Sequence, residues 1–147
     1  MIDSKLDGKA ITSGSASRFI KPGWIKDGRI TTEAFDLREG NPPETYVSFF
    51  LVNCGSADEQ MRSAFSILSK KITKHSKWSI SIIEIEDALS EINDEEMPFI
   101  CFKEKGVPHC GLFYLTNTQE KILEIKATLC LLAKKRLNSA YQLANSV

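Results

Sequence analysis

The sequence predicts an α+β domain, with a mixed β-sheet of about five to six strands, helices packed mainly on one face and a long C-terminal helix. Two observations indicate this class. Strand-like runs cluster in two places instead of alternating strictly with helices, and the longest helical pattern follows the last of these runs. A three-layer α/β arrangement is the alternative. We expect a flexible N-terminal arm over residues 1–17 and a single domain over residues 18–147.

The stretch from Pro98 to Leu115 predicts the central hairpin of the sheet. Two short apolar runs flank a charged turn at Lys105-Gly106. Residues 45–53 predict the clearest single strand, because they are almost all apolar or β-branched and lie between chain breakers. A continuous apolar run of this kind is typical of a strand that is covered on both faces.

Caps, breakers and periodicity predict the other elements. Ser56 and Glu59 fit a capping box at the start of a helix over residues 57–74. The last helix has a wide apolar stripe, which implies that the domain or a partner encloses it. The remaining predicted elements are a strand fragment and loop over residues 18–30, a strand over 30–39, a strand over 78–85 with a short helix after it, and the long helix from Thr116 or Asn117 to about Leu143.

Charge and hydropathy limit the classes of function. Nineteen basic residues balance nineteen acidic ones, so no global positive field favours strong non-specific binding of nucleic acid, although a local patch stays open. No run reaches the roughly 20 apolar residues that cross a bilayer, and the first twenty residues do not form a signal or transit peptide. We therefore expect a soluble cytoplasmic protein with reduced cysteines and no membrane partner.

His109 and Cys110 are the candidates for catalysis, because a catalytic thiol needs a base such as histidine beside it. Adjacent strand residues point to opposite faces, so His109 would instead pair with Cys101 across the hairpin or with Cys54. In the simpler interpretation Cys110 packs inward and His109 lies at the strand edge near Pro108.

Other signatures of chemistry are weak. A zinc site from Cys54, Cys101, Cys110 and a histidine would satisfy the ligand types, but the spacings match no zinc motif, so we expect no metal and no cofactor. The sequence contains no Gly-rich phosphate loop, no G-x-S-x-G and no H-E-x-x-H. This argues against the enzymes that these motifs mark, and no small molecule is assigned.

A basic and aromatic segment near the N-terminus could stack bases and pair with phosphates. In the alternative interpretation, Phe19 and Trp24 only anchor the arm to the core while the charges face water. The candidate ligand or nucleic-acid residues are Arg18, Lys21, Trp24, Lys26 and Arg29.

Charges of opposite sign are segregated further along the chain. The acidic stretch runs from Glu84 to Glu96 and follows a basic cluster at the end of a predicted helix. Separated clusters can orient a small neutral domain on a partner. The candidate partner-binding residues are Lys70, Lys71, Lys74 and Lys77.

The run SRFIKPGWIKDGRITTEAFDLREG, followed by TYVSFFLVN, resembles a pattern of small uncharacterised bacterial proteins. It has a Ser-Arg-aromatic start, a Gly-bearing loop, an Ala-Phe-x-Leu segment and a Tyr-Val-Ser strand, and a His-x-Gly-aliphatic element similar to residues 109–112 follows later. The resemblance implies a protein of an accessory or defence-type operon, in which small proteins act beside a larger effector. It brings no established activity.

Three functions follow as hypotheses. The first is a non-enzymatic accessory subunit of a bacterial complex, such as one in anti-phage defence or one associated with a toxin, that binds a protein partner or forms a homo-oligomer. The second is a small Cys/His-dependent enzyme or nucleotide-binding domain with a pocket near His109. The third is binding of single-stranded nucleic acid through residues 18–29, which the charge balance does not favour.

Overall fold

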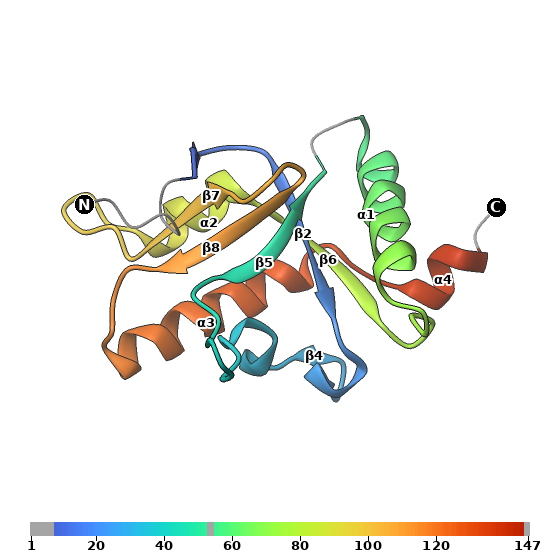
Figure 1. Ribbon diagram of the computed structural model, residues 1–147, viewed down its shortest axis with the longest axis horizontal. Helices are drawn as coiled ribbons and strands as arrows, with labels where there is room; N and C mark the ends of the chain where they lie inside the picture. The colour runs from blue at the N-terminus through green and yellow to red at the C-terminus, as the bar shows by residue number, and fades with distance from the viewer. Residues whose placement is uncertain (1–7, 53–54, 146–147) are drawn as a thin grey trace.

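The computed structural model describes residues 8–52 and 55–145, and within these it has a seven-stranded sheet (Figure 1). The strand order is β1-β7-β8-β5-β2-β6-β9, and each neighbouring pair is antiparallel. The α+β class is confirmed, with more strands than predicted. The strands are β1 (Ala10–Ile11), β2 (Ser15–Ile20), β5 (Val47–Leu51), β6 (Ser79–Glu84), β7 (Ile100–Glu104), β8 (His109–Tyr114) and β9 (Leu137–Ser139).

A small second sheet and six helical segments complete the described chain. The described helices cover both faces of the large sheet, in three layers, rather than mainly one face. The other elements are β3 (Ile25–Lys26), β4 (Arg29–Ile30), the 3₁₀ helices η2 (Pro22–Trp24) and η3 (Thr32–Phe35), and the α-helices α1 (Ala57–Lys71), α2 (Ile85–Ile92), α3 (Gln119–Lys134) and α4 (Ala140–Asn145).

Strand β6 explains why helices lie on both faces. Its side chains alternate between faces, and all but one of its residues are buried. Ile83 packs in the core that contains α2 and α3, whereas Ile80 and Ile82 pack against α1 and α4. In Figure 1, α3 runs below the sheet, and α1 and α4 lie together at the right of the view. A strand with two apolar faces needs two covering layers.

The predicted hairpin from Pro98 to Leu115 is present as β7 and β8, with Gly106 at positive φ in the turn. It lies toward one side of the sheet, and β5 occupies the middle position. On β5, Val47 and Phe49 are buried in the core, but Ser48, Phe50 and Leu51 are only half-buried. The prediction that this strand is covered on both faces is therefore wrong for one face.

The predicted strand over residues 30–39 is wrong. Only Ile30 belongs to a strand, and η3 follows. Side chains from distant strands bind the carbonyls of η3: the Tyr114 hydroxyl donates to the Phe35 carbonyl at 2.6 Å, and Arg18 donates to the Ala34 carbonyl. Ala34 and Phe35 are fully buried. These tertiary bonds replace the sheet bonds that a strand would need.

The N-terminal arm is shorter than predicted. Residues 10–11 form β1 at one edge of the sheet, and Ser15–Ser17 open β2, where all three side chains are buried. The prediction of a flexible arm is wrong for these residues, because β2 is paired on both sides by β5 and β6. Residues 1–7 lie outside the described residues.

The helix starts agree with the sequence better than the ends. The Ser56 and Glu59 capping box is present, and α1 ends at Lys71 instead of Lys74. The predicted last helix ends at Lys134, because the chain turns there to pair β9 with β6 before α4 begins. Thr118 takes the N-cap position without a side-chain cap, so the predicted caps at Thr116 and Asn117 are wrong.

None of the helices in the described part of the chain is long and apolar enough to pass through a membrane.

Candidate functional site

Arg18 lies where β2 and β5 move apart after two paired positions. Beyond the last paired position, the Arg18 guanidinium connects β2 to β5. Nη1 donates to the Ser48 carbonyl at 3.1 Å, and Nε and Nη2 donate to the Ala34 carbonyl at 2.9 and 2.8 Å. Arg18 therefore ties β2, β5 and η3 together.

Arg18 also places a positive charge in a half-buried position. Among the described residues, no carboxylate forms an ion pair with Arg18. Burial lowers the pKa of Arg18 from 12.5 to about 10, with Glu44 acting in the opposite direction. The guanidinium lies 5.2 Å from the centre of the Trp24 ring. Carbonyls take three of its five N–H groups, so donors are left for a ligand.

Three hollows with shared lining residues lie beside Arg18, and we call them together the aromatic groove. The middle hollow, about 170 Å³, shares Glu44 and Ser48 with a hollow of about 380 Å³ and shares Trp78 with another of about 580 Å³. The aromatic lining consists of Phe19, Trp24, Tyr46, Phe50 and Trp78. The charged lining consists of Arg18, Lys21, Arg38, Lys74, Lys77 and Lys105, with Glu44 as the acidic member.

Phe50 is the centre of the ring contacts in this groove. Its ring stacks on Phe19, with centroids 5.2 Å apart, and on His109, with centroids 5.1 Å apart. The Lys71 ammonium lies 5.2 Å from the Phe50 centroid. Phe19, Phe50 and His109 are all half-buried. The three strands β2, β5 and β8 thus present a row of rings with partly accessible surfaces.

Tyr46 extends this row because Gly111 leaves room for it. A Cβ atom at Gly111 would lie 2.5 Å from Cδ2 of Tyr46, so only glycine lets the ring rest on β8. The Tyr46 ring also contacts His109 and Phe113, at centroid distances of 5.7 and 5.3 Å. The Lys105 ammonium lies 5.3 Å from the Tyr46 centroid. Aromatic and basic groups alternate at this end of the groove as well.

His109 lies beside the groove and contacts Ser48, with 3.2 Å between His109 Nε2 and Ser48 Oγ. Burial lowers the pKa of His109, and the positive charge of Lys71 adds to this, while a hydrogen bond with the Lys105 backbone opposes both. A neutral imidazole beside a hydroxyl can exchange hydrogen bonds with a polar ligand.

Cys110 points away from His109, into the core. It is fully buried, and burial raises the pKa of its thiol to about 12. Burial also raises the pKa of Cys101 and that of Cys130, the latter to about 11. These thiols are poor nucleophiles. The structure therefore supports the simpler interpretation of Cys110, while Cys54 lies outside the described residues.

The structure brings some of the predicted ligand residues together and separates others. Arg18, Lys21 and Trp24 line the groove, and the Lys21 ammonium lies 5.1 Å from the Trp24 centroid. Lys26 and Arg29 lie apart on the β3–β4 hairpin, where the exposed Lys26 pairs with Glu33 at 3.8 Å. Asp27 and Gly28 form the turn of this hairpin, and both have the positive φ that such two-residue turns need.

The predicted partner-binding lysines also divide. Lys74 and Lys77 line the hollow beside Trp78, and Lys71 lies over Phe50. Lys70 is exposed on the last turn of α1 and does not line the groove. Three lysines that the charge pattern assigned to a protein partner therefore stand at the groove.

Glu44 contributes little negative charge to a ligand in the groove, because Arg38 holds it. The Arg38 amide and Nη2 bind the two Glu44 oxygens, and the Nη2 contact is 2.8 Å. Burial alone would raise the pKa of Glu44, but the hydrogen bonds and charge of Arg38 bring it below the ordinary value. The field in the groove is thus dominated by the basic side chains.

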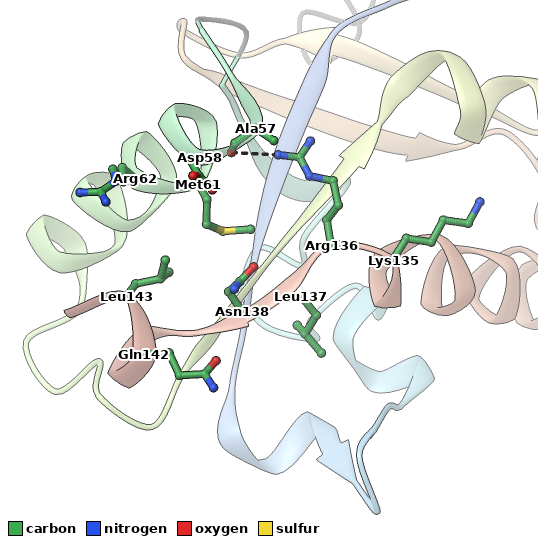
Figure 2. Close-up of a pocket in the computed structure, with 10 residues that line it drawn as sticks. All are labelled: Ala57, Asp58, Met61, Arg62, Lys135, Arg136, Leu137, Asn138, Gln142 and Leu143. Carbon is green, nitrogen blue, oxygen red and sulfur yellow. Dashed lines mark hydrogen bonds between the residues drawn. The ribbon is translucent and has the colours of Figure 1, made fainter. Parts of the chain in front are cut away.

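A second hollow, about 660 Å³, lies between α1, β9 and α4 (Figure 2). It also has basic residues, but the side chains of Arg62 and Lys135 extend to opposite sides of it in Figure 2. Arg136 is already bound: it pairs with Glu84 at 3.2 Å and donates to the Ala57 carbonyl at 3.2 Å. These charges do not converge on a ligand.

No group of three metal-binding side chains gathers in the described residues. The zinc proposal for Cys101 and Cys110 therefore has no support there, since Cys110 faces the core. Its other cysteine, Cys54, is not among the described residues.

Sequence reasoning did not identify Tyr46, Ser48, Phe50, Trp78 or Lys105 as site residues. The signal for three of them is their spacing: residues 46, 48 and 50 alternate along one strand and share a face. A lone serine between two aromatic positions in an apolar strand marks the face that is not core. Trp78 and Lys105 come from other segments, and only the fold places them here.

Four of the five parts of the resemblance pattern, all except the Gly-bearing loop, meet at this place. Arg18 binds the carbonyls of Ala34 and Ser48, and Ser48 contacts His109. Gly111 supports Tyr46 of the Tyr-Val-Ser strand. Residues far apart in the sequence thus build one local structure.

Comparison with known proteins gives no match, whether to a family model, a curated protein or a solved structure.

Proposed function

We propose that this chain binds single-stranded nucleic acid in the aromatic groove. The observation that supports the proposal is the lining, in which five aromatic side chains stand among six basic ones and the acidic Glu44. Arg38 and Glu44 neutralise each other, so five basic side chains are left. The chain as a whole is neutral, so this local excess of positive charge is a property of the groove.

Each kind of side chain has a partner in a nucleic-acid strand. Unpaired bases stack on aromatic rings, which contributes about 1–3 kcal/mol per base, and phosphates pair with lysine and arginine. Three adjoining hollows suit a ligand of several nucleotides better than a single nucleotide. Bases in a duplex are already stacked, so the rings favour single strands.

Arg18 is the residue that we assign to a phosphate. Its guanidinium is held by two carbonyls, lies over Trp24, lines the groove and has two N–H groups that these carbonyls do not take. An anion beside it would offset the cost of burying the charge, because an opposite charge favours the protonated form. A base on Trp24 and a phosphate on Arg18 can therefore belong to one nucleotide.

The test uses the tryptophans of the chain itself. The sequence has two, Trp24 and Trp78, and both line the groove, so intrinsic fluorescence reports on it. We expect labelled twelve-nucleotide RNA or DNA single strands to quench this fluorescence, and to bind more tightly than a duplex or a mononucleotide. The logarithm of the affinity should fall with the logarithm of salt concentration by roughly 0.7 per phosphate contact.

A matched pair of double variants locates the binding. Lys74→Glu with Lys77→Glu should lower the affinity by about tenfold or more and reduce the salt slope. Lys26→Glu with Arg29→Glu makes the same change of charge outside the groove and should leave the affinity nearly unchanged. Equal effects of the two variants, or no quenching at low salt, would contradict the proposal.

A protein-binding accessory subunit is the second candidate. One observation favours it: the α3 side chains Leu123 and Leu131 are 58% and 71% exposed. Large apolar side chains on one helix face are common at interfaces. A nucleotide-binding enzyme would use the same groove, and preferential binding of the mononucleotide in the titration above would favour it instead.

A further inference from the structure

Helix α3 carries a narrow exposed stripe on the side that faces away from the core. Leu123, Ala127 and Leu131 form its centre, with Glu120 before them and Lys134 after them, and all five are exposed. At 3.6 residues per turn, the five positions lie within about 40° of a line through Ala127. The opposite side of the helix supplies the core residues of α3, Ile125, Leu129, Leu132 and Ala133.

The stripe is symmetric about Ala127. The two leucines lie four residues on either side of it, and the two charged residues lie seven on either side. The charges are opposite, with the glutamate at the N-terminal end and the lysine at the C-terminal end. When two such helices pack antiparallel, residues at equal distances from the centre meet.

We infer that a second copy of this chain docks on α3 through a two-fold axis at Ala127. Leu123 then packs on Leu131 of the partner subunit, and Glu120 pairs with Lys134 of the partner subunit. Every contact occurs twice, as a two-fold interface requires. The small side chain of Ala127 lets the two helices approach at the centre. The charge order of the stripe is what selects a second copy in this orientation.

The interface is small. A stripe from residue 120 to 134 spans about 21 Å of helix, and one helix pair of this length is at the low end of specific interfaces. We therefore expect a dissociation constant on the order of 10 μM, so that dimers form at high concentration and dissociate on dilution. The groove is not part of this interface. The test of dimer formation can therefore fail or succeed independently of the test of nucleic-acid binding.

The test is sedimentation velocity of the full chain between about 1 and 300 μM. Wild type should shift from monomer to dimer, whereas Leu131→Glu should stay monomeric at every concentration. Position 131 is exposed, so this variant should keep the fold, which circular dichroism and the thermal midpoint would check. Single reversals Glu120→Lys and Lys134→Glu should each weaken the dimer by about threefold to tenfold.

The variant with both charges reversed decides whether the two helices pack antiparallel. Glu120→Lys with Lys134→Glu restores opposite charges across the two-fold axis, so it should recover the wild-type affinity. A double variant that is weaker than either single one overturns the antiparallel geometry. Wild type that stays monomeric throughout, or a Leu131→Glu protein that still dimerises, overturns the proposal and leaves the stripe to a partner of a different sequence.

Discussion

Two arginines, Arg18 and Arg136, both bind backbone carbonyls of distant segments, but their charges differ in how they are compensated. Arg136 binds the Ala57 carbonyl and also the Glu84 carboxylate, so its charge is neutralised within the fold. Arg18 binds the carbonyls of Ala34 and Ser48, which are neutral. Both side chains join distant segments, but only Arg18 does so while its charge is left for an external anion. The arginine at the hollow of Figure 2 is therefore satisfied within the fold, whereas Arg18 makes the groove a candidate site.

Replacing each arginine tests this comparison, because equal losses in the free energy of unfolding would contradict it. Arg18→Met leaves the buried Ala34 carbonyl and the Ser48 carbonyl without donors, so we expect the free energy of unfolding to fall by about 2–4 kcal/mol. Arg136→Met removes a partly exposed ion pair, for which about 1 kcal/mol is expected. Urea denaturation of both variants measures the difference, and a larger loss in Arg136→Met would contradict this account.

A smaller effect is expected at the other end of the groove. Gly111→Ala forces the Tyr46 ring to move, so we expect a loss of about 1–3 kcal/mol in the free energy of unfolding and weaker binding. The same substitution in a Tyr46→Ala background should cost less, because the clash is gone. Gly23→Ala is the control, since open space surrounds that position. An equal cost in both backgrounds would show that Tyr46 does not depend on the glycine.

The smallest effect concerns pH. The pKa of His109 is lowered by burial and by Lys71, so between the folded value and the ordinary value of 6.5 the unfolded chain binds more protons. The free energy of unfolding should therefore decrease as the pH falls through this window. His109→Gln should remove that part of the decrease, as measured by urea denaturation at pH 5.5 and 7.5. If the free energy of unfolding decreases more steeply in the variant, the pKa of His109 is raised in the folded chain and not lowered.

Local signals predicted local structure well. The Ser56 and Glu59 capping box, the turn at Lys105-Gly106 and the strand around Phe49 follow from a few neighbouring residues, and all are present. Residues 30–39 did not follow their β-propensity, because Arg18 and Tyr114 bind the carbonyls of η3 from far away in the sequence. No window of sequence contains that information.

The candidate site was predictable only in part. Arg18, Lys21 and Trp24 lie in one short segment, so composition alone identified them. The rest of the groove comes mainly from β5 and the segment before it, the segment after α1 and the β7–β8 turn, which meet only in the folded sheet. Lys26 and Arg29 matched the same composition but lie on a separate hairpin. Composition cannot distinguish a residue at the site from one a few positions beyond it.

Strand β9 has a consequence for synthesis on the ribosome. It is the last described strand to be made, yet it is the neighbour that covers one edge of β6. Until residues 137–139 have been synthesised, that edge has free backbone groups beside the buried Ile80 and Ile82. Open apolar edges favour pairing with other chains. During synthesis, this edge of β6 therefore stays open to pairing with other chains until β9 joins it.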